Sequence, residues 1–405
     1  MSSLFRRAVM DEMDAFIDTD DVIVLHGARQ VGKTCILRYL QDQLKGRGDT
    51  THFIDLEDSR YVRILDSGVD AFLKHLDEEG VSSPATGRKV FVFIDEVQYL
   101  SDPSSFLKLV ADHHKGIKLV VSGSSSFAMK TKFKDSLVGR TVNFEIYPLS
   151  FREFLLFNQV HFEDGKAYSE KKIEELRAGF KEYVLYGGYP RIVLTPEVEK
   201  KEKYLQQIVD TYVKKDIRDL AGVKDVDKFN KLLEALAGQS GQLLNMSELS
   251  NTTRIAIQTI KRYLFILENT YILKLVRPFS RNIRSELFKL PKIYFYDPGL
   301  MQMLWLKGLQ REVIGNVFET AIFAELVKKY GTESVFHWRT KDKKEIDFIL
   351  RLKDTLIPIE VKLNYEQFSP TAIRYFTTRY GIENYRVVGL NGVRKDKSCV
   401  YPWDA

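Results

Sequence analysis

One short segment near the N-terminus combines the residue types and the spacing that bind phosphate. It consists of Gly27, Ala28, Arg29, Gln30, Val31, Gly32, Lys33 and Thr34. Glycine lets such a loop curl so that backbone N–H groups point at phosphate oxygens, and the N-terminus of a following helix adds partial positive charge. We expect Lys33 to reach the β- and γ-phosphates of ATP and the Thr34 hydroxyl to ligate Mg²⁺, with Cys35 completing the nucleotide-binding segment.

Two adjacent carboxylates end an apolar run further along the chain. Residues 90–94 are Val, Phe, Val, Phe and Ile, and Asp95 and Glu96 follow them. A buried strand does not end in two acids for packing reasons alone, because burying unpaired charge is costly. We expect Asp95 to help hold Mg²⁺ and Glu96 to orient or deprotonate the attacking water.

Three further residues are candidates for the same site. Ser122 and Ser124 follow the run 118–121, and either could sense the γ-phosphate; an ordinary Ser-rich turn is the alternative. Arg140 could act as an arginine finger, in trans if subunits assemble, or it could be a surface arginine.

These motifs resemble those of a known family. The segments GARQVGKT, FVFIDEVQYL, VVSGSSSF, LVGR and YPLSFREF are similar to archaeal-type AAA+ ATPases, which carry a C-terminal domain of unknown function. The resemblance implies an additional-strand P-loop fold with Glu96 as the catalytic glutamate. Arg191 and Arg218, in the later segments GGYPRIV and YVKKDIRDL, are candidates for contacting nucleotide or a neighbour.

The segment 240–276 has the pattern of a helix-turn-helix, and the family resemblance also implies a winged helix here. Helices are expected over 246–250 and 254–269, with Ile257, Ile260, Leu264 and Leu267 toward the core. The residues expected to face outward, toward a DNA major groove, are Thr253, Arg254, Gln258, Lys261 and Arg262. Basic residues that could form a phosphate-contacting wing are Arg277, Arg281, Arg284, Lys289 and Lys292. Protein contacts or a plain solvated helix are the alternatives.

Two apolar runs near the C-terminus carry opposed acids. Asp347 lies in the run 345–350, and Glu360 and Lys362 share one face of the run 356–363. With a turn centred on Lys353 and Asp354, antiparallel pairing places Asp347 directly opposite Glu360. Opposed like charges are destabilising, and a divalent cation would remove the repulsion.

This arrangement resembles the PD-(D/E)xK nuclease superfamily. The resemblance implies that Asp347 and Glu360 bind Mg²⁺, that Lys362 positions water or developing charge, and that Glu319, in a helix over 316–329, matches the helical acidic position. A salt-bridged hairpin and an inactive nuclease fold used for binding are the alternatives.

The elements that position these residues alternate in type. Strands are expected over 22–26, 51–56, 90–95, 118–122 and 142–146 with helical patterns between several of them, which indicates an α/β fold with a parallel P-loop sheet. We expect a AAA+ P-loop ATPase domain over 1–150, a helical lid or linker over 151–238, a winged helix over 239–305 and an α/β restriction-endonuclease-like domain over 306–405.

The composition permits this organisation. A chain of 405 residues with net charge +6 and few cysteines fits a globular, cytoplasmic protein, and no apolar run is long enough for a membrane span. We expect an ATPase that couples nucleotide state to a C-terminal DNA-binding or nuclease-like module. The alternatives are a Mg²⁺-dependent DNA nuclease with a regulatory ATPase, and a signalling or scaffold ATPase that binds a protein partner. The oligomeric state stays open, with a homo-oligomer possible.

Overall fold

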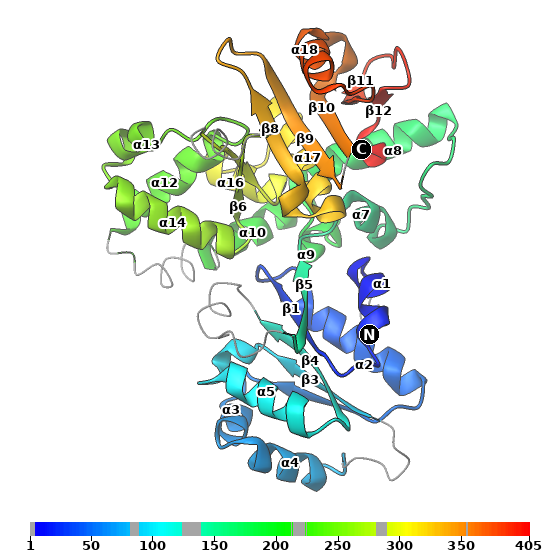
Figure 1. Cartoon of the computed structure of the whole chain (residues 1–405), viewed down its shortest axis with the longest axis vertical. Helices are drawn as coiled ribbons and strands as arrows, with labels where there is room; N and C mark the ends of the chain where they lie inside the picture. The colour runs from blue at the N-terminus through cyan, green and yellow to red at the C-terminus, as the bar shows by residue number, and fades with distance from the viewer. Residues whose placement is uncertain are drawn as a thin grey trace. The chain divides into compact units, whose positions relative to one another are not determined.

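The computed structural model describes residues 5–81, 89–123, 139–211, 213, 223, 225–280, 290–353 and 355–405. The chain divides into two compact units, Met1–Tyr147 and Pro148–Ala405 (Figure 1). The finer division into four domains stays a prediction. None of the described helices is both long enough and apolar enough to cross a membrane.

A parallel sheet forms the centre of the first unit. Its strands are β1 (Val22–Gly27), β2 (Thr51–Asp55), β3 (Val90–Asp95), β4 (Ile117–Gly123) and β5 (Thr141–Ile146). Their order is β2-β3-β4-β1-β5 and every neighbouring pair is parallel, so the carboxyl ends of the strands meet at one edge. These are the strands predicted from the sequence. Every residue of β3 is buried, as expected for an apolar run inside a parallel sheet.

Helices pack against this sheet. They are α1 (Val9–Met13), α2 (Lys33–Gly46), α3 (Ser59–Asp66), α4 (Val69–Glu78) and α5 (Pro103–His113). Apolar residues of α3, α4 and α5 join alternate residues of β1, β3 and β4 in one core cluster. The Asp102 carboxylate accepts a hydrogen bond from the Ser105 N–H and starts α5.

The second unit begins with helices, as predicted for 151–238. They are α7 (Phe151–Phe157), α8 (Glu170–Tyr186), α9 (Pro190–Val193), α10 (Val198–Ile208) and α12 (Val226–Gly238). A capping box between Ser150 and Glu153 starts α7. A Cβ atom on Gly188 would lie 2.3 Å from the Leu149 carbonyl oxygen, so the break between α8 and α9 requires glycine there.

Short helices and a two-stranded antiparallel ribbon follow. They are α13 (Met246–Thr253), α14 (Ile257–Asn269), β6 (Leu273–Val276), β7 (Lys292–Phe295) and α16 (Pro298–Leu306). The sequence analysis missed α16. Nearly all of its residues are buried, so it lacks the alternation of apolar and polar faces that marks a surface helix.

A mixed sheet completes the second unit. Its strands are β8 (Val335–Arg339), β9 (Glu345–Leu352), β10 (Thr355–Asn364), β11 (Arg386–Asn391) and β12 (Cys399–Val400). Two helices accompany the sheet, α17 (Gly315–Tyr330) before β8 and α18 (Thr371–Tyr380) between β10 and β11. The strand order is β12-β11-β10-β9-β8 (Figure 1). Ile359 pairs with Phe348 in the antiparallel β9–β10 hairpin, which confirms the register predicted from the turn position.

The β6–β7 ribbon packs directly against this sheet. Pro278 forms a parallel bridge with His337 of β8. The Tyr294 ring centroid lies 4.8 Å from that of Phe323 and 5.1 Å from that of Phe348. The segments expected to be a winged helix and a nuclease-like domain therefore share one core.

Candidate functional site

The predicted phosphate-binding loop joins β1 to α2 at the carboxyl edge of the first sheet. Gln30 and Gly32 have φ values of 63° and 98°, which curl the backbone. Lys33 is buried, and its Nζ donates to the carbonyl oxygens of Gly27 at 3.1 Å and Ala28 at 2.8 Å. Burial lowers the pKa of the Lys33 ammonium to about 8, an effect that Glu96 and Asp95 oppose. The lysine is therefore mostly cationic at pH 7 and held against its own loop.

The other loop residues differ in exposure. Ala28 and Val31 are fully buried, so their side chains pack inside the first unit. Arg29 is partly exposed, whereas Gln30 and Cys35 are exposed. A Cβ atom on Gly27 would lie 2.1 Å from the Ile146 carbonyl oxygen, so this glycine is required for packing against β5.

Arg7 supports the loop from outside the motif. Its Nη1 donates to the Val31 carbonyl at 2.8 Å, and its Nη2 donates to the Tyr147 carbonyl at 2.9 Å. Arg7 is buried and ties the loop to the end of β5. The role of Arg7 could not be read from the sequence, because no motif surrounds the Arg6–Arg7 pair before the first strand.

Asp95 is brought against two hydroxyl groups at the same edge. The Thr34 hydroxyl donates to Asp95 Oδ2 at 2.6 Å, and the Ser122 hydroxyl donates to Asp95 Oδ1. The sheet order explains this contact, because β4 lies between β1 and β3 and carries Ser122 between the loop and the acids. Oxygen ligands suit Mg²⁺, and the exposed Thr34 hydroxyl beside a carboxylate fits an ion bound together with a triphosphate.

Glu96 has a conformation that non-glycine residues rarely adopt. Its φ is 58° in the left-handed region, and its N–H donates to Ser122 Oγ at 3.2 Å. Its carboxylate accepts a hydrogen bond from the Gln98 amide, a contact that the sequence analysis did not foresee. Unfavourable backbone conformations of this kind cluster at functional sites, where the surrounding structure holds them.

Three candidates of the first unit remain, the serines Ser122 and Ser124 and the arginine Arg140. Ser122 is fully buried and orients Asp95 rather than facing solvent, and Ser124 lies outside the described residues. Arg140 precedes β5, and its carbonyl accepts from the N–H of Val22, where β1 begins. The loop follows the other end of β1, about 16 Å away for a strand of this length. Arg140 Nε also lies 2.6 Å from Asp112 Oδ1. Its role as an arginine finger, in trans if subunits assemble, stays a prediction.

The outward face of α14 is partly as predicted. Arg254, Gln258, Lys261 and Arg262 are exposed. Thr253 is wrong as a DNA-contacting residue: it is buried in the last turn of α13, and its hydroxyl donates to the Leu249 carbonyl at 2.6 Å. Ile257, expected in the core, is the first residue of α14 and is 38% exposed.

The structure describes two of the basic residues expected in the wing, Arg277 and Lys292. Arg277 is exposed, whereas Arg281, Arg284 and Lys289 lie outside the described residues, as does Arg218. Lys292 is wrong as a phosphate contact. It is buried on β7, and its Nζ lies 2.6 Å from Glu345 Oε1 and 3.6 Å from Glu319 Oε1. All residues of β7 are buried, so Lys292 faces protein and not solvent.

The hairpin acids are paired with a lysine. Lys362 Nζ lies 2.9 Å from Glu360 Oε2 and 3.4 Å from Asp347 Oδ2, and the Val361 N–H donates to Asp347 at 2.8 Å. The repulsion that we expected a divalent cation to remove is thus relieved by an ammonium group. In the described part of the chain, no three His, Cys, Asp or Glu side chains are grouped so that they could hold a metal ion. The residues do not fit the expected nuclease metal site in this arrangement.

Burial and mutual repulsion change the acidity of these carboxyls. Burial, and then Asp347, raise the pKa of Glu319 to about 7 and that of Glu360 to about 8. Although burial disfavours its charge, Asp347 and Glu360 raise the pKa of Lys362 above its ordinary value. The cluster therefore reduces its negative charge by taking up protons as well as by pairing with lysine.

The stability of the second unit should depend on pH through Glu360. Because its folded-state pKa is raised above the ordinary 4.5, the folded state retains a proton that the unfolded state loses. The stabilisation is present at low pH and is lost as pH rises through about 8. We expect the free energy of unfolding to fall between about pH 5 and pH 8 in the wild type, and to fall less in Glu360→Gln.

Tryptophan fluorescence can measure this effect in urea titrations. All tryptophans of the chain, Trp305, Trp338 and Trp403, lie in the second unit. Glu366→Gln, which removes an exposed acid next to β10, is the matched control and should keep the wild-type pH dependence. Equal pH dependence in Glu360→Gln and wild type would contradict the expectation.

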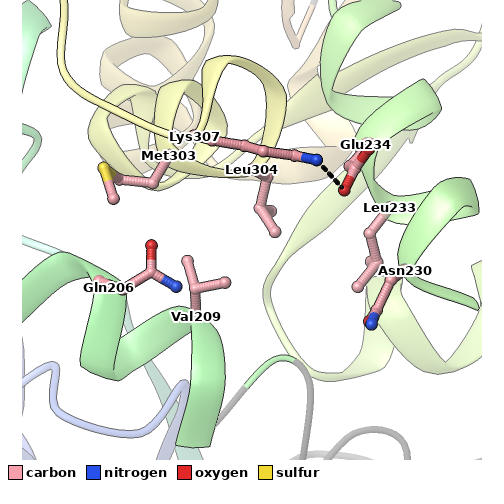
Figure 2. A pocket seen from close by; sticks show the side chains of 8 residues that line it. All are labelled: Gln206, Val209, Asn230, Leu233, Glu234, Met303, Leu304 and Lys307. Carbon is pink, nitrogen blue, oxygen red and sulfur yellow. Dashed lines mark ion pairs between the residues drawn. The ribbon is translucent and has the colours of Figure 1, made fainter. Parts of the chain in front are cut away.

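A small pocket lies among the helices of the second unit (Figure 2). Its volume is about 210 Å³, and α10, α12 and α16 contribute most of its lining. The apolar side chains around it include Val209, Leu233 and Leu304. At its rim Lys307 Nζ lies 3.1 Å from Glu234 Oε1. With this charged pair satisfied internally, the pocket offers little of the chemistry found at the edge of the first sheet.

Comparisons with known families agree with the geometry of the first unit. Residues 19–155 match the family model described as an AAA domain. Residues 177–312 match a domain of unknown function (DUF8612), and residues 314–401 match another (DUF4143). The AAA match covers the whole sheet and supports an AAA+ P-loop ATPase fold, and with it nucleotide binding, for the first unit.

Relatives extend over most of the chain. An uncharacterized protein of Haemophilus influenzae is 29% identical over 365 residues, which are 88% of this chain and 86% of the relative. An uncharacterized protein of Methanocaldococcus jannaschii is 25% identical over 335 residues, which are 81% of this chain and 71% of the relative. The two units therefore recur together in one chain.

Solved structures give weaker likenesses. AMPPCP-bound DnaA from Aquifex aeolicus shares 15% identity, with 64% of this chain and 86% of that chain covered and a TM-score of 0.30. The ORC2 protein of Aeropyrum pernix in its ADP form shares 14% identity, with 63% and 81% covered and a TM-score of 0.33. TM-scores this low do not indicate a shared overall fold.

Proposed function

We propose that the chain is an AAA+ ATPase that binds ATP with Mg²⁺ at the carboxyl edge of the first sheet and hydrolyses it. The observation that carries the proposal is the convergence of the Lys33 loop, Thr34 and Asp95 at this edge, with Thr34 hydrogen-bonded to Asp95 at 2.6 Å. Lys33 and Thr34 begin α2 and Asp95 ends β3, and a surface turn has no physical reason to bring these two elements together.

The side chains divide the work of phosphoryl transfer. Lys33 and the N-terminus of α2 hold the phosphates, while Thr34 and Asp95 would hold Mg²⁺, which neutralises charge on the β- and γ-phosphates when bound. Glu96 orients the water and accepts its proton, and Gln98 keeps the Glu96 carboxylate in place. Ser122 orients Asp95 from the neighbouring strand. Loss of turnover in variants of Lys33 and Glu96 tests this assignment.

We propose further that the second unit binds DNA through α14. The elements α12, α13, α14, β6 and β7 follow one another as in a winged helix, and a β-bridge between Leu243 and Lys292 adds the short pairing before α13. Three exposed cationic residues accompany these helices: Arg254 caps the C-terminus of α13, and Lys261 and Arg262 lie on α14. Exposed cationic side chains on and next to a helix suit a phosphate backbone and a major groove.

Replacing Arg254, Lys261 and Arg262 together by alanine is expected to weaken DNA binding by about tenfold or more. It should also reduce the salt dependence of binding, because fewer counterions are released from DNA when fewer phosphates are contacted. Fluorescence anisotropy with a labelled duplex at several salt concentrations measures both quantities. The matched control removes the same charge from α8 and α10 by replacing the exposed Lys171, Lys181 and Lys203. An equal loss of DNA affinity in both variants would show that only the net charge of the protein matters, which would contradict binding through α14.

An ATPase assay with and without DNA and Mg²⁺, with DNA integrity followed in the same tube, separates this proposal from its alternatives. Stimulation of hydrolysis by intact DNA supports coupling between nucleotide state and a DNA-binding second unit. Failure to bind DNA at low salt would instead favour a protein partner.

A further inference from the structure

The acidic cluster of the second unit receives a second lysine that the hairpin motif does not contain. Lys292 lies on β7 of the ribbon, well before the hairpin in sequence. Its Nζ is 2.6 Å from Glu345 Oε1 and 3.6 Å from Glu319 Oε1, and its side chain is only 3% exposed. An ammonium buried this deeply requires close anionic partners, because removing it from water is costly.

Charge complementarity shows how the cluster is balanced. Four carboxylates, Glu319, Glu345, Asp347 and Glu360, meet Lys292, Lys362 and Arg339. Although burial disfavours its charge, Glu319, Asp347 and Glu345 raise the pKa of Lys292. Among the described carboxylates, the hairpin lysine Lys362 forms ion pairs with Asp347 and Glu360, whereas Lys292 pairs with the helical acid Glu319 and shares Glu345 with Arg339.

The ribbon fixes this lysine in place. Tyr294 lies two residues after Lys292 and so points to the same side of β7. It is fully buried, its ring packs on Phe323 and Phe348, and its hydroxyl donates to Glu319 Oε1. A Cβ atom on Gly241 would lie 3.4 Å from the Glu319 carboxylate, so the segment before α13 also closes over the cluster.

We infer that the Lys292 ammonium occupies the place of a divalent cation between Glu319, Glu345 and Asp347, so that the ribbon closes this acidic cluster to metal ions. The second unit is then a binding module rather than a metal-dependent nuclease while Lys292 is in place. The inference does not depend on the proposed ATPase activity. As the structure places them, the described carboxylates do not form a ready metal site. Without the ammonium, the repulsion between these buried carboxylates is unrelieved, and a divalent cation that draws their oxygens together would remove it.

Mn²⁺ binding to the full chain without nucleotide tests the inference, with free Mn²⁺ followed by electron paramagnetic resonance. We expect Lys292→Met to bind Mn²⁺ about tenfold to hundredfold more tightly than the wild type, and a second change, Asp347→Asn, to remove the gain. The dependence on Asp347 separates this site from any ion held in the first unit.

Lys274→Met is the matched control. Lys274 lies on β6 of the same ribbon but pairs with Glu268 and Glu333 and not with the cluster, so its loss should create no Mn²⁺ site. A folded Lys292→Met that binds Mn²⁺ no better than the wild type would overturn the inference. If that variant does not fold, the wild type decides: Mn²⁺ binding that Asp347→Asn removes would overturn the inference, and its absence would support it.

Discussion

Lys33→Ala is expected to lower ATP affinity by about tenfold to a hundredfold, since a charged donor to phosphate contributes roughly 1.5–3 kcal/mol and its loss leaves phosphate charge unmatched. The Lys33 ammonium is held 3.1 Å from the Gly27 carbonyl and 2.8 Å from the Ala28 carbonyl, at the opening of the loop. A phosphate that enters the loop would meet a cation already in position, which limits the entropy lost on binding. Isothermal titration with ATP and Mg²⁺ measures the loss directly.

Lys45→Ala is the control for this result. Lys45 is an exposed lysine in the last turn of α2, so its removal changes the charge of the same helix without touching the loop. It should leave ATP affinity unchanged. Circular dichroism must show that Lys33→Ala is folded, because Lys33 is buried. A folded Lys33→Ala protein with wild-type affinity would contradict the nucleotide site.

Glu96→Gln should have the opposite profile, with ATP binding retained and hydrolysis reduced by about 10²- to 10⁴-fold, the usual contribution of a general base. Glutamine preserves the size of the side chain but cannot accept a proton from water. Asp95, Thr34 and Ser122 would keep their mutual hydrogen bonds, so binding should survive. Phosphate release under steady-state conditions and nucleotide titration together measure the two effects.

Glu57→Gln serves as the control for charge near the same edge of the sheet. Glu57 is exposed and follows the end of β2, so it shares the carboxyl edge but lies outside the Asp95 network. It should hydrolyse ATP at the wild-type rate. Hydrolysis by Glu96→Gln at that same rate would remove Glu96 from the mechanism, even if Lys33 proved essential for binding.

Asp95 of the first unit and the acidic cluster of the second unit differ in the groups that approach their carboxylates. Asp95 is approached by two hydroxyls, Thr34 and Ser122, which leave its charge in place for a cation. Asp347 and Glu360 are approached by Lys362, and Glu319 by Lys292, so a cation is already supplied by the protein. The same residue type is therefore hydrogen-bonded to hydroxyls in the first unit and ion-paired in the second.

The sequence by itself determined the features whose parts lie close together along the chain. The loop from Gly27 to Thr34, the acids at the end of β3 and the register of the β9–β10 hairpin all follow from local spacing, because a turn length or a strand period fixes which side chains meet. Apolar runs of strand length likewise identified the strands of the first sheet.

Only the tertiary structure decided which distant groups meet. It brought Arg7 to the Val31 carbonyl, Ser122 to Asp95 and Lys292 to Glu345, and it buried Thr253 where an exposed DNA contact was expected. Such contacts depend on strand order and on the packing of elements far apart in sequence. The period of a helix or strand tells which face a residue shares with its neighbours, but not which other element covers that face.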